Sequence, residues 1–293
     1  MIQLDQVNGL SRADFVAALD GIVERAPWVL EAVHARAPFA DLAALLAAVD
    51  AAIREAPSER RLALIQGHPD LAGKAARAGD LTRESTAEQA SAGLDRLSDE
   101  EFAAFHRLND AYRQRFGFPF LVCVRRHGKE SILGQFERRL AQDRPAEEAT
   151  AIDEILRIVA LRLDQLVAAP GRLKVHGRLS THVLDTHSGQ PAQGVRIALY
   201  ELDGADRARL VVEAVTNADG RTDQPLIAGR PVPIARYELR FAVSTYFARQ
   251  GVSLADPPFL DTVPVRFAVA EPEGHYHVPL LVTPWSYATY RGS

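Results

Sequence analysis

Cysteine and net charge are both scarce in this sequence, and each scarcity excludes a class of protein. Cys123 is the one cysteine among 293 residues, which leaves no internal disulfide framework and no cysteine-based zinc site. It lies in the apolar stretch FPFLVCVRR, where buried packing is the expected role. The formal net charge of -4 provides no basic surface, so we expect no nucleic-acid partner.

Long apolar runs are absent as well. No stretch approaches the roughly 18 apolar residues that a membrane helix needs. The first residues, MIQLDQVNGLSRADF, have neither the basic segment nor the apolar segment of a secretory signal. Hydrophobic residues make up 47% of the chain and charged residues 25%, which is ordinary for a soluble globular protein. We therefore expect a cytoplasmic protein with no membrane partner.

Residues 11 to about 167 have the apolar spacing of α-helices. Apolar side chains recur three and four positions apart at Leu42, Leu45, Leu46, Val49 and Ile53. Ser98 and Glu101 stand at capping-box spacing where another helix should begin, and Gly117 is placed to end it. The apolar face of the last helix predicted in this half also contains Arg162.

The apolar period changes to two after residues 168–174, AAPGRLK, whose proline and glycine indicate a short linker. Apolar side chains then occupy every second position in residues 195–200, 236–241 and 263–269. The turn-forming clusters DTHSGQPAQG, NADGRTD and AEPEGH separate such runs, and this spacing favours an antiparallel sandwich.

These patterns predict a multidomain α and β fold. An all-α domain is expected at residues 1–167 and an all-β sandwich at residues 175–293, joined by the linker at residues 168–174. The chain length also suggests about two domains, and each half is long enough to bury its own core.

His68 is the first candidate for chemistry. In IQGHPDLAG it follows Gly67 and precedes Pro69, and a residue before proline is disfavoured in a helix. His68 should therefore project from a rigid turn. A histidine is the natural proton carrier near neutral pH. The alternative is a surface histidine that only occupies the turn.

Glu88 and Arg162 each have a functional and a structural interpretation. Ser85 and Glu88 have the S-x-x-E spacing of a capping box, so Glu88 either caps a helix or serves a site. Arg162 on an apolar stripe would bury a charge at high cost unless an anion pairs with it. A substrate carboxylate is one such partner, since arginine offers it two donors. The alternative is that Arg162 extends its charged end to solvent at the stripe's edge.

The stretches GHPDLAG, STAEQASAGL, RFGFPFLVCV and LRLDQLV together resemble the 2-oxo-4-hydroxy-4-carboxy-5-ureidoimidazoline (OHCU) decarboxylase family over residues 8 to 168. The resemblance implies that His68 and Glu88 are the catalytic pair. It further implies that the substrate is bound by Pro69, Ser85, Gln89, Leu121, Val122 and Arg162.

The decarboxylation that this resemblance implies needs no cofactor. The carboxylate-bearing carbon of OHCU adjoins a ring C=N carbon, so the electrons released with CO2 flow into the imine. The protein has to orient the carboxylate, stabilise charge on nitrogen and deliver a proton to one face. His68 is expected to donate a proton or a hydrogen bond, with Glu88 as its partner and Arg162 as the anion anchor. The sequence leaves open which of His68 and Glu88 delivers the proton.

Three histidines in the second half raise a different possibility. His275 and His277 in GHYHVPLL stand two apart on a predicted strand, so they share a face, and LSTHVLD adds His182. Three histidines with an open position would form a hydrolytic zinc site. Only Asp185 is a candidate carboxylate for such a site, and Arg221 in TNADGRTD would repel a metal cation but favour an anionic substrate. The plain alternatives are a hydrogen-bonded strand histidine and a turn-stabilising arginine.

GRLSTHVLDTHSGQPAQGVRIALYEL, TNADGRTD and HYHVPLLVTPWSYATYRGS resemble the 5-hydroxyisourate hydrolases, which are transthyretin-like enzymes, over about residues 173 to 293. The resemblance implies a two-sheet sandwich with a short helix near STYFARQG and metal-free hydrolysis. It implies a catalytic role for His182, Arg221, His277 and Ser293, with Tyr290, Arg291 and Gly292 binding substrate, and it gives His275 no comparable role.

The two resemblances together imply consecutive reactions in urate degradation, 5-hydroxyisourate to OHCU and OHCU to (S)-allantoin, with these small molecules as the partners. The hydrolase family implies a homo-oligomer, with a tetramer favoured and sites at subunit interfaces. A rival hypothesis is a transthyretin-like carrier of small ligands whose helical half is an oligomerisation module. A polar pocket with His182, Arg221 and His277 speaks against a carrier.

Overall fold

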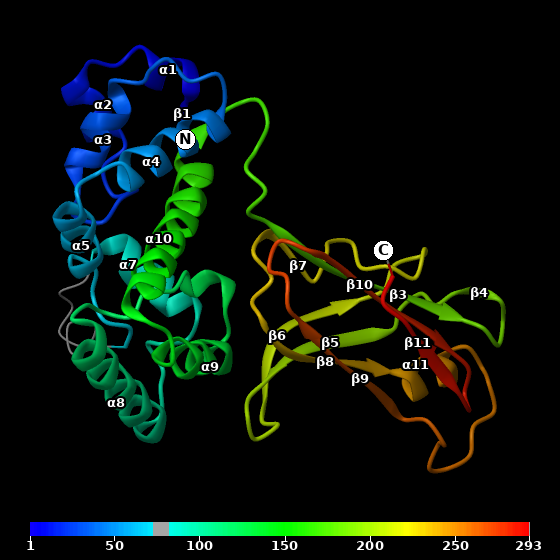
Figure 1. Cartoon of the computed structure of the whole chain (residues 1–293). Helices are drawn as coiled ribbons and strands as arrows, with labels where there is room; N and C mark the ends of the chain where they lie inside the picture. The colour runs from blue at the N-terminus through cyan, green and yellow to red at the C-terminus, as the bar shows by residue number, and fades with distance from the viewer. Residues whose placement is uncertain (73–81, 293) are drawn as a thin grey trace. The chain divides into compact units, whose positions relative to one another are not determined.

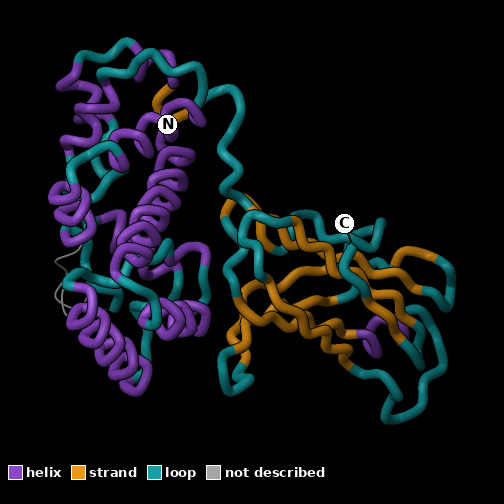
Figure 2. Tube along the Cα trace, viewed as in Figure 1, coloured by secondary structure: helices purple, strands orange, loops and turns teal. Residues whose placement is uncertain are grey.

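The computed structural model describes residues 1–72 and 82–292. The chain forms two compact units, Met1–Arg125 with Ser131–Val175, and His176–Ser293 with the short segment Arg126–Glu130. The first is built mainly of helices and the second mainly of strands (Figure 2). Each unit has its own cluster of buried hydrophobic residues.

The helical unit is folded around one long helix, α10 (Figure 1). The elements of residues 1–168 are β1 (Ile2–Gln3), α1 (Leu4–Asn8), α2 (Arg12–Ala18), α3 (Pro27–His34), α4 (Leu42–Arg54), α5 (Ser58–Gln66), α7 (Arg83–Ser91), α8 (Asp99–Phe116), the 3-10 turn Val124–Arg126, α9 (Lys129–Leu140), α10 (Arg144–Leu166) and β2 (Val167–Ala168). Helix α10 packs against α4 and α5, and β1 pairs in parallel with β2. The long helix therefore presents its buried face, with Arg162, to the centre of the unit.

Helix ends in this unit follow from short-range sequence signals. Ser98 and Glu101 form the predicted capping box of α8, and Gly117 ends that helix in the left-handed conformation at φ 78°. The capping-box interpretation of Ser85 and Glu88 is wrong, because Thr82 caps α7 and both residues lie inside the helix. The glutamate side chain is thereby left for a tertiary contact.

The second unit is a sandwich of two sheets (Figure 1). One sheet has the order β11-β10-β3-β4, with β7 also paired to β3, and the other has the order β6-β5-β8-β9. The strands are β3 (Gly177–Asp185), β4 (Gln190–Pro191), β5 (Arg196–Leu202), β6 (Ala208–Val215), β7 (Ile227–Arg230), β8 (Ala235–Ala242), β9 (Thr262–Val269), β10 (His275–Val282) and β11 (Tyr287–Thr289). The short helix α11 (Val243–Arg249) lies where the hydrolase resemblance placed it.

The pairing of β3 with β10 differs from the antiparallel sandwich that the sequence predicted. These two strands run parallel, with Pro279 opposite His182 and His277 opposite Ser180. The strands that flank them are antiparallel to them. Turn clusters reveal hairpins between neighbouring strands, but a parallel pair is joined through a long crossover that leaves no local signal. This pairing places two histidines from distant parts of the chain on one sheet.

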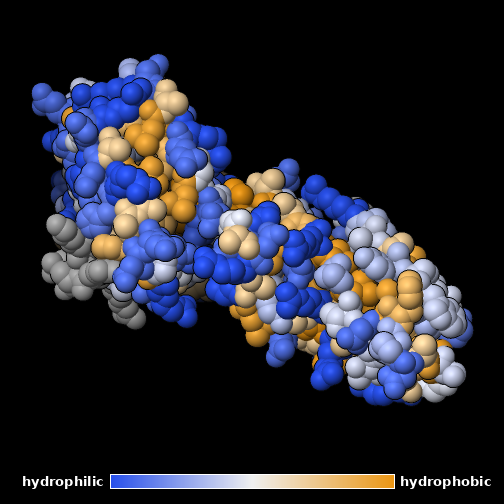
Figure 3. All heavy atoms as spheres, turned by 90° about the horizontal axis from the view of Figure 1, so that it is seen from below, coloured by the Kyte–Doolittle hydropathy of each residue, from blue (hydrophilic) through white to orange (hydrophobic). Residues whose placement is uncertain are grey.

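Apolar side chains fill the interior of both units, and the visible surface is largely hydrophilic, with apolar side chains gathered in smaller patches (Figure 3). Cys123 is buried, as its apolar neighbours predicted. Among the described helices, none combines the length and the apolar character that crossing a membrane would take.

Candidate active sites

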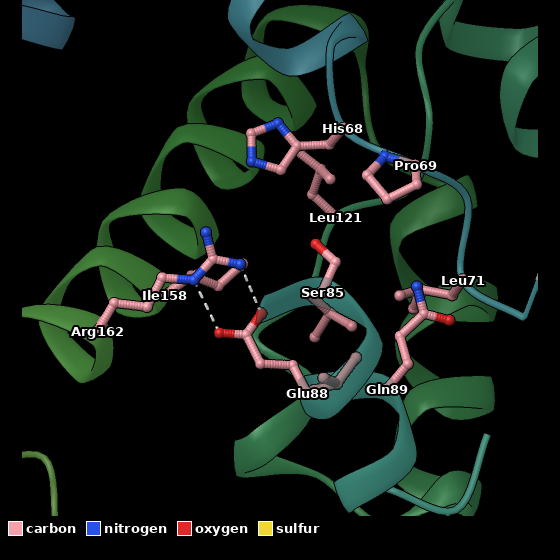
Figure 4. A pocket seen from close by; sticks show the side chains of 11 residues that line it. His68, Pro69, Leu71, Ser85, Glu88, Gln89, Leu121, Ile158 and Arg162 are labelled. Atoms are coloured by element: carbon pink, nitrogen blue, oxygen red, sulfur yellow. Dashed lines mark hydrogen bonds and ion pairs between the residues drawn. The ribbon is translucent and has the colours of Figure 1, made fainter. Parts of the chain in front are cut away.

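A pocket in the helical unit gathers every residue that the sequence predicted for its site (Figure 4). Four separate segments of the unit contribute. The pocket is lined by His68, Pro69 and Leu71 after α5, by Ser85, Glu88 and Gln89 of α7, by Leu121, Val122 and Val124 between α8 and α9, and by Ile158 and Arg162 of α10. Leu71, Val124 and Ile158 were not predicted from the sequence, because apolar residues in helices and turns give no signal beyond core packing.

His68 is held in one orientation at this pocket. Its Nδ1 lies 2.9 Å from the Leu64 carbonyl oxygen. A carbonyl only accepts hydrogen bonds, so Nδ1 carries the proton and Nε2 of the neutral ring keeps a free lone pair. Burial lowers the pKa of His68, and the neutral ring is therefore favoured. The residue is 8% exposed, so the interpretation of His68 as a surface histidine is wrong.

Arg162 is buried and paired, so it does not extend to solvent. Its Nε and Nη2 donate to the two carboxylate oxygens of Glu88 at 2.9 and 2.8 Å, which the dashed lines of Figure 4 mark. Its Nη1 donates to the Gly21 carbonyl at 2.7 Å. Burial lowers the pKa of Arg162, but the hydrogen bonds and charges of Glu88 and Glu24 outweigh burial and raise it. Both oxygens of Glu88 therefore bind Arg162, not His68.

Glu24 is a buried member of this cluster that was not predicted from the sequence. Its Oε2 lies 3.3 Å from Arg162 Nη1 and 3.3 Å from Ser85 Oγ, which donate to it. The residue is 4% exposed. It stands in GIVERAPW, between helices, where no apolar period shows which side chains point inward. The one signal in the sequence was that Glu24 is an acidic residue with no helix-cap position nearby to explain it.

Buried polar side chains fix the backbone around the pocket. The Gln89 side-chain oxygen accepts from the Ala72 backbone N–H at 3.0 Å, and Asn109 donates to the Leu71 carbonyl at 2.8 Å. Arg139 donates to the Leu121 carbonyl at 2.6 Å. These contacts hold the pocket walls in place without ligand, as a preorganised site requires.

The candidate site of the β unit lies on the outward side of β3 and β10. His182 and His277 project from these adjacent strands, with ring centroids 6.5 Å apart. Arg221 reaches the same place because its backbone bridges to that of His182. The structure thus brings together the three residues that the sequence placed in one site, although they come from separate stretches of the chain.

Two glycines allow the backbone to approach these histidines. A Cβ on Gly292 would lie 2.6 Å from Cδ2 of His277, and the Gly292 N–H donates to the His277 carbonyl at 2.8 Å. A Cβ on Gly220 would lie 2.3 Å from the Val183 carbonyl oxygen and 3.2 Å from Cδ2 of His182. Only glycine fits such close contacts. The backbone at Gly292 therefore lies directly against His277.

The surroundings of His182 and His277 favour the neutral form of both imidazole rings. Burial lowers the pKa of His182, and the Arg221 charge lowers it further. Burial also lowers the pKa of His277, followed by the charges of Arg221 and His182. Neutral imidazole is the form that accepts a proton from water. The pair is therefore available as a general base at neutral pH.

Ser180 connects His277 to His275. The Ser180 Oγ lies 3.0 Å from Nδ1 of His277 and 3.3 Å from Nε2 of His275. An Nδ1–H of His277 pointing at this hydroxyl would leave Nε2 as the basic nitrogen. His275 thus lies one hydroxyl away from the predicted catalytic histidine.

The remaining predicted residues stand at the edge of this site. Tyr290 is exposed, and the Arg291 guanidinium lies over the Tyr276 ring, 4.8 Å from its centroid. Ser293 lies outside the described residues. Within residues 1–72 and 82–292 no three His, Cys, Asp or Glu side chains are grouped closely enough to hold a metal ion, so this geometry gives the three-histidine zinc hypothesis no support.

Comparison with known proteins shows to which families the two parts of this chain belong. The family model "OHCU decarboxylase" matches residues 8–164, and the family model "HIUase/Transthyretin family" matches residues 179–292. The chain therefore belongs to the OHCU decarboxylase family in its helical part and to the HIUase/transthyretin family in its β part. The predicted fold class, with the helical domain first, is confirmed.

Particular relatives agree with both assignments. A 5-hydroxyisourate hydrolase of Deinococcus radiodurans is 57% identical over 118 residues, 40% of this chain and 98% of its own. An OHCU decarboxylase of Haloferax volcanii is 40% identical over 162 residues, 55% of this chain and 94% of its own. The crystal structure of an (S)-allantoin synthase matches all of both chains, with 34% identity and a TM-score of 0.52. Both domains of this chain thus occur together in a solved relative.

Proposed function

We propose that this chain is a bifunctional enzyme of urate degradation, which hydrolyses 5-hydroxyisourate to OHCU and decarboxylates OHCU to (S)-allantoin. The observation that carries the proposal is the presence of both enzyme families in one chain, in the order of an (S)-allantoin synthase that matches its whole length. The pocket of the helical unit and the His182–His277 pair supply a separate candidate site for each reaction.

Decarboxylation is assigned to the pocket of His68, Glu88 and Arg162. The bond between the ring carbon and the carboxylate breaks, and its electron pair moves into the adjacent C=N bond. The former imine nitrogen takes up the proton of the neighbouring hydroxyl, which becomes a carbonyl, and the former imine carbon takes up a further proton, so each CO2 released consumes one proton. Arg162 is the cation that attracts the substrate carboxylate, with Ser85, Gln89 and the backbone at Leu121 and Val122 around the ring.

His68 is the proton carrier in this proposal. Its Nδ1 is engaged with Leu64, so Nε2 is the nitrogen that exchanges a proton with the substrate. Glu88 acts through Arg162, because both its oxygens accept hydrogen bonds from that guanidinium. This geometry supports His68 rather than Glu88 as the residue that delivers the proton.

Hydrolysis is assigned to His182, Arg221 and His277. A neutral imidazole removes a proton from water, and the oxygen attacks the ring carbonyl of 5-hydroxyisourate. The C–N bond of the cyclic amide then breaks, and the leaving nitrogen takes up the proton. Arg221 attracts the anionic ring and stabilises the oxyanion that develops on the carbonyl. Tyr290, Arg291, Gly292 and Ser293 are proposed to complete the substrate-binding surface.

Assembly and location complete the proposal. We propose a cytoplasmic homo-oligomer, with a tetramer formed through the β domain and its sites at subunit interfaces. The proposed domains are residues 1–167 and 175–293, with residues 168–174 as the linker. The open position of Tyr290 supports a site completed by a second subunit, since 57% of this residue is exposed. Sedimentation of the intact protein measures the number of subunits.

The function is tested with freshly generated 5-hydroxyisourate. Its ultraviolet absorbance reports the first step, and the circular dichroism of the product reports stereospecific formation of allantoin. His68→Ala should abolish allantoin formation and spare hydrolysis, and His277→Ala should do the reverse. Decay at the spontaneous rate with the wild-type protein would favour the carrier hypothesis. Metal analysis of active protein separates this mechanism from zinc hydrolysis.

A further inference from the structure

Glu24 places a second carboxylate directly behind two residues that line the decarboxylase pocket. Its carboxylate is within hydrogen-bond distance of Arg162 and Ser85, at 3.3 Å from each, and both residues belong to the proposed substrate site. The side chain is 2% exposed, less than that of Glu88 at 13%. A carboxylate buried this deeply is costly unless its charge is compensated. Its position against two substrate-binding groups calls for a role in the reaction.

The charges within the ion pairs of Arg162 do not cancel. Glu24 and Glu88 are two carboxylates that share one guanidinium. Burial favours the neutral form of His68, so the ring adds no positive charge before substrate arrives. The anionic substrate would bring a further negative charge into this group. A like charge close to a carboxylate is unfavourable unless a proton or a cation enters with it.

His68 is the group placed to take up that proton. The charges that act on it are Glu24, which favours its protonated form, and Arg162 and Arg25, which oppose it. Arg162 is ion-paired with two carboxylates, which outnumber its single positive charge, and Arg25 is exposed. Since decarboxylation consumes one proton for each CO2 released, a proton taken up with the substrate is the one that the product carbon needs.

Resting on the decarboxylase function proposed above, we propose that Glu24 is a positioning residue with two effects. Its carboxylate holds Arg162 and Ser85 in place, and its negative charge causes His68 to take up a proton when the substrate anion binds. The carboxylate reaches the substrate only through these neighbours. Its hydrogen bonds fix the direction of the guanidinium, and its charge favours the imidazolium that serves as proton donor.

The test compares Glu24→Gln with the wild-type protein. The amide keeps the size of the side chain and an oxygen that accepts hydrogen bonds, but it removes the charge. The matched control is Glu31→Gln, because Glu31 is a glutamate of α3 paired with Arg12 on the surface. Allantoin formation from OHCU is followed by circular dichroism from about pH 5.5 to 8.5, and kcat and KM are determined at each pH.

Removing the charge of Glu24 lowers the affinity of His68 for a proton, and it also reduces the electrostatic repulsion of the substrate anion. We expect kcat to fall roughly tenfold at neutral pH, with KM unchanged or lower, and the pH profile of kcat to shift to lower pH. The control should behave as the wild type. A residue that only supports the fold would lower the melting temperature and leave the pH profile in place.

An unchanged pH profile for Glu24→Gln, or a shift to higher pH, would overturn the role of Glu24. Glu24→Asp separates the effect of the charge from that of side-chain length, because it keeps the carboxylate on a shorter side chain. This variant should keep the wild-type pH profile even if kcat falls. If wild type and Glu31→Gln also fail to form allantoin, the decarboxylase function itself is wrong. The two failures are therefore distinguishable.

Discussion

The Glu88 carboxylate and the Arg162 guanidinium form a two-pronged ion pair, with contacts of 2.9 and 2.8 Å between residues 74 positions apart in the chain. The pair orients the guanidinium at the wall of the pocket before any substrate is present. The ion pair depends on the planar guanidinium of arginine, because a lysine ammonium is a point charge and cannot donate to two oxygens in parallel.

Arg162→Lys should therefore impair decarboxylation although the charge is kept. We expect kcat/KM for OHCU to fall about 100-fold, in the range that loss of a bidentate charged contact costs. The measurement is allantoin formation by circular dichroism. Hydrolysis of 5-hydroxyisourate by the same preparation is the internal control and should not change. Equal loss of both activities would indicate misfolding, and full decarboxylase activity would remove Arg162 from the site.

The charge of Arg221 should be visible in the titration of two histidines. Arg221 lowers the pKa of both His182 and His277, in addition to burial. Arg221→Gln should therefore raise both pKa values, so that the rings become protonated at higher pH. Proton NMR of the imidazole C2–H signals across about pH 4 to 8 measures this directly.

A remote charge serves as the control for that titration. Arg209→Gln removes an exposed arginine on β6 that pairs with Glu201, and it should leave both pKa values in place. The acid limb of the residual hydrolase activity in Arg221→Gln should move to higher pH in parallel with the rings. Unchanged titration of His182 and His277 would contradict the placement of Arg221 beside them.

Gly292→Ala should damage the hydrolase site selectively. The new Cβ would lie 2.6 Å from Cδ2 of His277, so either the ring or the terminal segment has to move. A displacement near 1 Å at a catalytic group lowers rates by about 100-fold. The ultraviolet decay of 5-hydroxyisourate measures the effect, and decarboxylation should persist. Normal hydrolysis in this variant would show that the segment does not lie against His277 in the working enzyme.

The stability of the helical unit should depend on Glu147. This residue is fully buried and accepts hydrogen bonds from Arg139 and Tyr112. Glu147→Leu leaves the Arg139 charge buried without its carboxylate, which costs about 3–5 kcal/mol in the free energy of unfolding. Glu148→Leu is the matched control, because Glu148 forms an exposed pair with Arg144 worth less than about 1 kcal/mol. Urea denaturation followed by far-ultraviolet circular dichroism compares the two. Equal midpoints would contradict the role of the buried cluster.

The sequence by itself determined the features that depend on neighbours a few residues away. The start of α8 at Ser98 and its end at Gly117 follow from side-chain and backbone groups within one helical turn. The apolar positions of β9 follow from alternating burial on the two faces of a sheet, and so do those in the first half of β5. Family motifs around His68, His182 and His277 indicated both reactions because they are short and contiguous.

Only the tertiary structure decided which partners those residues have. Glu88 had the spacing of a cap but binds Arg162, and Glu24 lies 138 positions from the same guanidinium. The parallel pairing of β3 with β10 brings Ser180 between His275 and His277. Such contacts join segments far apart in the chain, and their energy depends on burial that the completed fold creates. The spacing of residues along the sequence does not reveal which side chains the completed fold buries together.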